Sequence, residues 1–257
     1  MSEPTAGRVI FVGAGPGAAD LITVRGAQRL AQAEVVLHDA LTDPVLRALA
    51  PNALWLHVGK RGFRDSTDQT AINALLVRHA SAGRLVVRLK GGDPSVFGRL
   101  EEELEALAAA GIDSEVVPGV SAALAAAAAT KRPLTRRGSG RSVSLTTAMT
   151  REGELYAARH ADTEVFYMAG KQLAALSRRL RAAGWPADAP TSVVSRAGWP
   201  DALHSEQTVA GLGAAALLHA GRPTVVTVGA GAAAIESPLH AAQPAAATAA
   251  RALAAKP

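Results

Sequence analysis

Short apolar runs alternate with helical patterns through the first half of the chain, and this alternation constrains the fold more than any other feature. The apolar runs predict strands at residues 8–12, 34–37, 54–58, 85–89 and 115–117. The segments between them predict helices near residues 24–32, 44–49, 68–81, 98–110 and 121–129. Such alternation of strands and helices indicates a mainly parallel sheet with helices on both faces.

A basic segment, TKRPLTRRGSGR at residues 130–141, interrupts this pattern. It contains proline and glycine and has little apolar content, so we expect a linker between two α/β domains, residues 1–134 and 135–240. In the second domain we expect strands near residues 142–146, 164–168, 191–195 and 224–228, an edge strand at 203–209, and helices near 151–159, 171–183 and 209–218. Residues 241–257 are rich in alanine, and we expect them to form a disordered tail.

The composition narrows the class of protein. Cysteine is absent, which excludes disulfides, thiol catalysis and zinc–thiolate sites, and the histidines show no metal-ligand spacing. No apolar run approaches the ~18 residues of a membrane span, and we see no signal peptide, so we expect a cytoplasmic protein. The net charge is +5 and arginine outnumbers lysine, which fits either codon bias or an acidic small-molecule ligand. Because the basic residues are scattered and aromatic residues are 4%, we expect no specific nucleic-acid partner.

The segment GAGPGAADLITV follows the first predicted strand and imitates a dinucleotide-binding motif. Gly13, Gly15 and Ala18 satisfy the G-x-G-x-x-G/A pattern, and Asp39 ends the second apolar run. In a dinucleotide fold the helix begins inside the motif, so that its N-terminus faces the pyrophosphate. Here the next helix begins only after Thr23, and Pro16 stiffens the turn. A nicotinamide oxidoreductase is therefore the less favoured alternative, and the glycines instead admit a ligand against the main chain.

Four further motifs stand at predicted carboxyl ends of strands, where open α/β sheets bind ligands. They are HDAL after the second strand, VGKRG after the third, GGDPSVFGR after the fourth and VPGVSAALAA after the fifth. Together with GAGPG, they resemble the tetrapyrrole (precorrin) methyltransferase family, from near the N-terminus to about Ile235. Within that family, VGKRG with GGDPSVFGR is most similar to the members that methylate uroporphyrinogen III.

The resemblance implies an enzyme with S-adenosylmethionine in a cleft between two α/β domains. The implied reaction is C-methylation of uroporphyrinogen III at C2 and C7 to give precorrin-2, with S-adenosylhomocysteine as the second product. The resemblance also implies a homodimer. A sulfonium methyl donor has no phosphate, which accounts for a glycine-rich loop without a helix N-terminus. A different precorrin C-methyltransferase remains the main alternative.

The resemblance also implies roles for particular residues. The implied cofactor contacts are Pro16, Gly91, Gly92, Asp93, Val96, Ser121, Ala122, Met168, Ala197 and Thr224. Asp39 and Lys60 are the implied catalytic pair, because a proton must leave the alkylated macrocycle and a carboxylate can accept it.

Uroporphyrinogen is an octacarboxylate, so its binding requires cations. The resemblance implies substrate contacts at Arg99, with Glu102 in a GR-x-x-E pattern, and at Arg137. The chain departs from the family pattern at Ala40, at Leu100 and at Thr147–Ala148. We expect these departures to affect substrate contacts more than cofactor binding.

Overall fold

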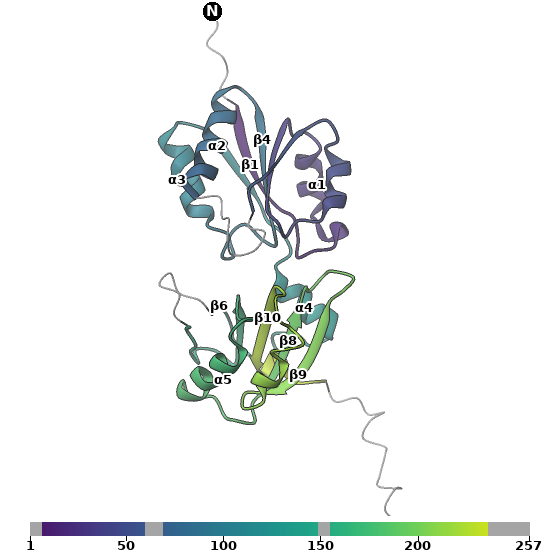
Figure 1. The fold of residues 1–257 in the computed structure, drawn as a ribbon, viewed down its shortest axis with the longest axis vertical. Helices are drawn as coiled ribbons and strands as arrows, with labels where there is room; N and C mark the ends of the chain where they lie inside the picture. The colour runs from purple at the N-terminus through teal and green to yellow at the C-terminus, as the bar shows by residue number, and fades with distance from the viewer. Residues whose placement is uncertain (1–6, 60–68, 149–154, 236–257) are drawn as a thin grey trace, which may run out of the picture.

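The computed structural model describes residues 7–59, 69–148 and 155–235. Two α/β domains lie one above the other along the long axis, each built around a five-stranded sheet (Figure 1). The expected tail at residues 241–257 lies outside the described residues, and so does Lys60. Among the described helices, none is long and apolar enough to cross a membrane.

The first sheet is entirely parallel, as the alternation of strands and helices predicted. It contains β1 (Arg8–Gly13), β2 (Val35–His38), β3 (Leu54–His57), β4 (Leu85–Lys90) and β5 (Ser114–Val117), in the order β3-β2-β4-β1-β5. In the interior strand β1, Val9 and Phe11 belong to the core cluster on one face, and Ile10 and Val12 belong to the cluster on the other. These four side chains are fully buried, because helices cover each face.

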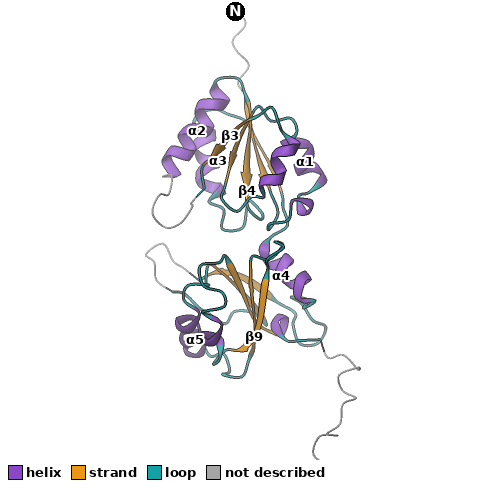
Figure 2. Cartoon of the chain, turned by 45° about the vertical axis from the view of Figure 1, so that its right-hand side comes forward, coloured by secondary structure: helices purple, strands orange, loops and turns teal. Residues whose placement is uncertain are grey.

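The helices of the first domain divide between the two faces of its sheet. Figure 2 shows α1 (Val24–Leu30) on one side, and α2 (Gln69–Ser81) with α3 (Leu100–Ala109) on the other. Thr23 is the N-cap of α1, and its hydroxyl accepts a hydrogen bond from the Gly26 N–H at 3.0 Å, as its sequence position suggested. The helix expected near residues 44–49 is a 3-10 helix, η2 (Pro44–Leu49).

The second sheet is mixed. It contains β6 (Val143–Thr147), β7 (Thr163–Tyr167), β8 (Pro190–Ser195), β9 (Leu203–Thr208) and β10 (Thr224–Gly229), in the order β6-β7-β10-β8-β9. Only the β6–β7 pair is parallel. The edge strand predicted at residues 203–209 is confirmed as β9. One helix, α5 (Leu173–Ala182), packs its buried leucines on this sheet.

Two predicted helices of the second domain do not form as expected. The segment 209–218 contains only the short 3-10 helix η3 (Leu212–Ala215), and Gly211 and Gly213 in this segment disfavour a longer helix. The helix expected at residues 151–159 lies partly outside the described residues, and its described part, 155–159, is not helical.

Helix α4 (Ala122–Thr130) belongs to the second domain, although the sequence placed it in the first. Ala123 and Ala126 pack in one buried cluster with Val165 of β7 and Val194 of β8. The packing therefore changes from the first sheet to the second at residues 118–121, ahead of the expected boundary at residue 134. An alanine-rich helix has no strongly apolar stripe, so its sequence does not indicate which sheet it covers.

A buried histidine, His219, connects the segment after η3 to strands β8 and β9 of the second domain. His219 is fully buried; its Nδ1 lies 2.9 Å from the Ser195 hydroxyl, and its Nε2 lies 2.9 Å from the Ser205 hydroxyl. Burial lowers the pKa of His219, and the positive charges of Arg222 and His204 lower it further. The folded protein therefore favours the neutral imidazole.

We expect the free energy of unfolding to decrease in acid partly because of His219. A histidine pKa that is lower in the folded state means that the unfolded chain binds the proton first as the pH falls below about 6.5. The contribution of His219 to the free energy of unfolding is then complete above that pH and is lost as the pH falls towards the lowered pKa. Urea titrations between about pH 5 and pH 8 measure the free energy of unfolding at each pH. This free energy should depend on pH more steeply in the wild type than in His219→Asn, by up to about 1.4 kcal/mol per pH unit. Equal slopes in the two proteins would contradict this assignment.

Candidate active site

Three glycine-containing turns meet at the carboxyl edge of the first sheet. Gly15 and Gly92 exchange backbone hydrogen bonds, with the Gly15 N–H donating at 3.3 Å and the Gly92 N–H at 2.7 Å. A Cβ atom on Gly119 would lie 2.3 Å from the Gly92 carbonyl oxygen and 2.8 Å from Gly13 Cα. Gly92 itself has a φ of +72°, and a Cβ atom there would meet nothing within 4 Å. The turns therefore pack closely against one another and leave open space above Gly92, which a ligand can approach.

Asp93 ties two of these turns together. Its Oδ2 accepts a hydrogen bond from the Gly119 N–H at 2.8 Å, and its Oδ1 accepts one from the Ser95 N–H at 2.8 Å. From the sequence we expected this carboxylate to face the amino or hydroxyl groups of a cofactor. In the structure each of these oxygens also holds a backbone N–H, so Asp93 shapes the turns that surround the open space.

Substituting Gly119 tests the close packing of the turns. In Gly119→Ala the new methyl group must displace the backbone of Gly92 or Gly13, because the contacts are far below van der Waals distance. We expect affinity for S-adenosylhomocysteine, measured by calorimetry, to fall at least about tenfold, or about 1.4 kcal/mol. Gly184→Ala is the control, because Gly184 has a φ of +89° and open space around its Cα. Unchanged affinity in Gly119→Ala would separate these turns from ligand binding.

The second domain contributes to the same region through the carboxyl end of β7. The Tyr167 hydroxyl lies 2.6 Å from the Ser121 hydroxyl and accepts a hydrogen bond from the Ala123 N–H at 3.3 Å. The Tyr167 ring lies 5.1 Å from the ring of Phe97, which belongs to the GGDPSVFGR segment of the first domain. Met168 follows Tyr167 with a φ of +59° and an exposed side chain. Left-handed backbone at a methionine is strained, and such strain gathers at functional sites.

A second contact joins the turn after β1 to the turn after β8. The Ala18 N–H donates to the Gly198 carbonyl at 2.7 Å, and a Cβ atom on Gly17 would lie 2.3 Å from the Trp199 ring. Pro16 therefore lies beside the segment that contains Ala197. Ala197 itself is buried in the α4 packing cluster, and the Thr224 hydroxyl donates to the Arg222 carbonyl at 2.8 Å. Both of these residues are buried.

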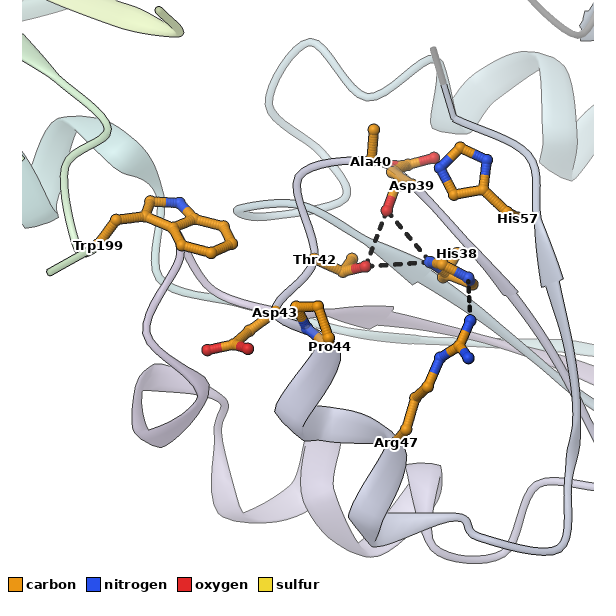
Figure 3. A pocket seen from close by; sticks show the side chains of 9 residues that line it. All are labelled: His38, Asp39, Ala40, Thr42, Asp43, Pro44, Arg47, His57 and Trp199. Carbon is orange, nitrogen blue, oxygen red and sulfur yellow. Dashed lines mark hydrogen bonds between the residues drawn. The ribbon is translucent and has the colours of Figure 1, made fainter. Parts of the chain in front are cut away.

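A cavity of about 670 Å³ opens beside Asp39. It is lined by His38, Asp39, Ala40, Thr42, Asp43, Pro44, Arg47, His57 and Trp199. Figure 3 shows Trp199, from the second domain, on the side opposite His38 and Arg47. A Cβ atom on Gly91 would lie 3.0 Å from Leu41 Cβ, so the GGDP turn and the segment containing Asp39 are neighbours.

The surroundings of His38 in the cavity wall favour its neutral form. Burial lowers the pKa of His38, and the charges of His57 and Arg47 also lower it. The Arg47 guanidinium donates to His38 Nε2 at 3.5 Å, which leaves the ring proton on Nδ1. Nδ1 lies 3.2 Å from the Thr42 hydroxyl and 3.2 Å from the Asp39 carbonyl, so His38 supports the backbone of Asp39.

Two of the three expected substrate contacts pair with each other, and the third lies elsewhere. Arg99 precedes α3 and donates to both carboxylate oxygens of Glu102, at 2.7 and 2.6 Å, in an exposed ion pair. Arg137 belongs to a turn that closes through Arg136 and Gly140, and Gly140 lies against Ala230 beyond the carboxyl end of β10. Tyr167, which contacts the GGDPSVFGR segment, lies beside the other end of β10, roughly 17 Å away for a strand of this length. Within the described residues of one chain, the turn that contains Arg137 therefore lies apart from the region where substrate is expected.

The sequence interpretation missed three charged residues behind Asp39. Arg88 and Lys90 lie on β4, Glu103 lies on α3, and all three are buried. The available signal was the sequence LVVRLK, which places Arg88 inside the predicted buried strand and Lys90 directly after it. Buried charges require partners, so this strand already indicated hidden carboxylates.

Comparisons with known proteins agree with this architecture. A family model, Tetrapyrrole (Corrin/Porphyrin) Methylases, matches residues 8–213. The chain therefore belongs to the tetrapyrrole methylase family, as its strand-end motifs predicted. It is 46% identical over 195 residues to the uroporphyrinogen-III C-methyltransferase of Pseudomonas aeruginosa, covering 74% of this chain and 80% of that protein.

Two further relatives show how the match extends. The crystal structure of uroporphyrin-III C-methyl transferase from Thermus thermophilus, complexed with S-adenyl homocysteine, superposes with a TM-score of 0.77 at 35% identity. That match covers 88% of this chain and 98% of the other. Siroheme synthase 1 of Klebsiella pneumoniae is 43% identical over 215 residues, which is 81% of this chain and 45% of that protein. The chain thus spans less than half of the siroheme synthase.

Proposed function

We propose that this chain transfers methyl groups from S-adenosylmethionine to C2 and C7 of uroporphyrinogen III, giving precorrin-2 and S-adenosylhomocysteine. One observation supports this most directly: the GGDP turn, with open space above Gly92, neighbours the segment that lines the cavity beside Asp39, since a Cβ atom on Gly91 would lie 3.0 Å from Leu41 Cβ. A methyl donor and an acceptor can therefore lie next to each other at the edge of one sheet. The relatives from Pseudomonas aeruginosa and Thermus thermophilus support the same reaction.

The residues present fit the cofactor. When bound, S-adenosylmethionine supplies an electrophilic methyl group on a sulfonium. Gly91 and Gly92 offer main chain without side-chain obstruction, and Pro16 and Met168 offer apolar surface from two sides. Ser121 and Ala122 lie where the Tyr167 hydroxyl meets the Ser121 hydroxyl and the Ala123 N–H, and they are further proposed contacts. Asp93 and Val96 of the GGDP segment, with the buried Ala197 and Thr224, complete the proposed cofactor contacts.

The proposed chemistry assigns separate tasks to Asp39 and Arg99. Asp39 accepts the proton that leaves the alkylated macrocycle, since it is a carboxylate of the cavity next to the GGDP turn. Lys60 is the proposed partner of Asp39 in proton transfer and follows Gly59, which lies against the backbone of Ala40. Arg99 exchanges its ion pair with Glu102 for a carboxylate of the substrate.

The decisive experiment incubates the purified protein with uroporphyrinogen III and a labelled methyl donor. We expect a product with two added methyl groups by mass spectrometry. Methylation only of later precorrin intermediates would assign a different enzyme of the same family. Tight NAD binding with no calorimetric response to S-adenosylhomocysteine would overturn the methyltransferase itself.

We further infer a homodimer located in the cytoplasm, without a specific nucleic-acid partner. The exposed leucines Leu217 and Leu218 offer apolar surface on the second domain that a partner copy could cover. Light scattering should give a mass of twice the 26.2 kDa of one chain. A mass of one chain would refute the dimer and leave the proposed reaction untouched.

A further inference from the structure

A continuous chain of ion pairs runs from the interior of the first domain to the cavity. Lys90 Nζ donates to Glu103 Oε2 at 2.5 Å, and Arg88 Nε donates to Glu103 Oε1 at 2.9 Å. Arg88 Nη2 then donates to Asp39 Oδ1 at 2.7 Å. The side chains of Arg88, Lys90 and Glu103 are 4%, 3% and 0% exposed, whereas that of Asp39 is 26% exposed.

Every nitrogen of the Arg88 guanidinium donates a hydrogen bond. Besides its two carboxylate partners, Arg88 donates through Nη1 to the carbonyls of Leu37 and Leu89 at 3.4 and 3.3 Å. Leu37 is in β2, directly before the segment that contains Asp39. The planar fork of Arg88 is therefore immobilised on one side by Glu103 and on the other by backbone, and it presents one fixed donor to Asp39.

The charges of the four residues in this series of ion pairs balance one another. Arg88 and Lys90 on β4 face Glu103 on α3 and Asp39 after β2, so two cations meet two carboxylates, and Gln69 of α2 adds a hydrogen bond to Glu103. Although burial lowers the pKa of Arg88, the charges of Asp39 and Glu103 more than offset it, and the net shift is upward. Burial lowers the pKa of Lys90, and the charge of Arg88 lowers it further. Arg88 is thus the permanently charged member that both carboxylates share.

We propose that Arg88 is a positioning residue for Asp39: held from behind by Glu103, it fixes Oδ1 and leaves the other carboxylate oxygen for the substrate. Among the described residues, nothing donates a hydrogen bond to Asp39 Oδ2. A carboxylate anchored at one oxygen has its second oxygen in a defined direction, which proton abstraction requires. This inference rests on the proposed role of Asp39 in the methyl transfer.

The shape of the arginine side chain makes the inference testable. A lysine at position 88 keeps the positive charge but has a single nitrogen, so it cannot bridge Glu103 and Asp39 while also holding the Leu37 carbonyl. We expect Arg88→Lys to lower kcat roughly hundredfold, as a misplaced catalytic group does. The KM for the macrocycle and the dissociation constant for S-adenosylhomocysteine should change by less than about twofold, because Arg88 does not line the cavity.

A double-mutant cycle distinguishes positioning from a general structural role. The cycle combines Asp39→Asn, Arg88→Lys and the double variant, with kcat, KM and S-adenosylhomocysteine affinity measured for each. If Arg88 acts through Asp39, Arg88→Lys lowers kcat in the wild-type background and has no further effect in the Asp39→Asn background. Additive losses, or a rise in KM together with the fall in kcat, would overturn the proposal.

The control is Arg29→Lys. Arg29 Nε lies 3.0 Å from both oxygens of Glu115, and neither residue lines the cavity, so the same substitution there alters an arginine–carboxylate pair unconnected to Asp39. We expect Arg29→Lys to leave kcat unchanged. Arg88→Met is the second variant and should lose at least as much kcat as Arg88→Lys.

Three other results of these experiments would each overturn a particular claim. Full activity in both Arg88 variants, with Asp39→Asn impaired, would refute this inference alone. Full activity in Asp39→Asn would refute the proposed role of Asp39 instead. If neither Arg88 variant folds, as judged by circular dichroism and thermal unfolding, the ion chain serves folding and the proposal is overturned.

Discussion

Asp39→Asn is expected to lower kcat for methylation of uroporphyrinogen III by roughly 10²–10⁴-fold. The amide cannot accept the proton that the alkylated macrocycle must lose, although it has almost the same shape as the carboxylate. Affinity for S-adenosylhomocysteine should remain within about twofold, because Asp39 lies in the neighbouring cavity and not above Gly92. Steady-state kinetics and calorimetry on the same preparation measure both quantities.

Asp43→Asn is the matched control for this prediction. Asp43 lines the same cavity, so its substitution removes the same charge from the same space. Its side chain accepts a hydrogen bond from the Val45 N–H at 2.9 Å as the N-cap of η2, and asparagine caps helices equally well. We expect nearly unchanged kcat in Asp43→Asn. Equal losses in the two variants would attribute the effect to the charge of the cavity, and no loss in Asp39→Asn would remove Asp39 from catalysis.

Arg99→Ala is expected to raise the KM for the macrocycle by roughly ten- to hundredfold. A hydrogen bond to a charged group contributes about 1.5–3 kcal/mol, and each 1.4 kcal/mol corresponds to about a factor of ten. Saturation kinetics with varied uroporphyrinogen III measures this effect.

Two companion variants show whether the effect belongs to Arg99 itself. Arg99→Lys restores the charge without the bidentate geometry, and we expect it to recover part of the affinity. Arg181→Ala removes an exposed arginine at the end of α5, remote from the cleft, and should leave KM unchanged. Identical KM values in wild type and Arg99→Ala would show that the GR-x-x-E pattern does not contact substrate in this chain.

Much of the fold could be predicted because it depends on local patterns. The apolar residues from Val9 to Val12 indicate a strand buried on both faces, and β1 is such a strand in the interior of a parallel sheet. Thr23 indicates the start of α1 because its hydroxyl caps the helix three residues on. The α4 segment shows the limit of this reasoning, since alanine packs equally well on either sheet and its partner is set by residues far along the chain.

The candidate site, like the fold, could be predicted from the sequence only in part. The motifs placed Gly92 and Asp39 at strand ends of one parallel sheet, where neighbouring strands bring their loops together. They did not indicate that Asp93 binds the N–H of Gly119, 26 residues away, or that Arg88 binds Asp39 across 49 positions. Arg137 stands close to the strand motifs in sequence, yet its turn lies against the opposite end of β10.

The sequence by itself determined the two α/β domains, the family and the strand-end segments that bear the glycines and Asp39, because each is recorded in short-range patterns of apolar, small and polar residues. Only the tertiary structure decided which charges meet. The pairing of β2 with β4 sets Leu37 opposite Arg88, and α3 packs Glu103 behind that arginine. These partners are chosen by strand order and register, which no local pattern specifies, and a buried charge is stable only where that register supplies its partner.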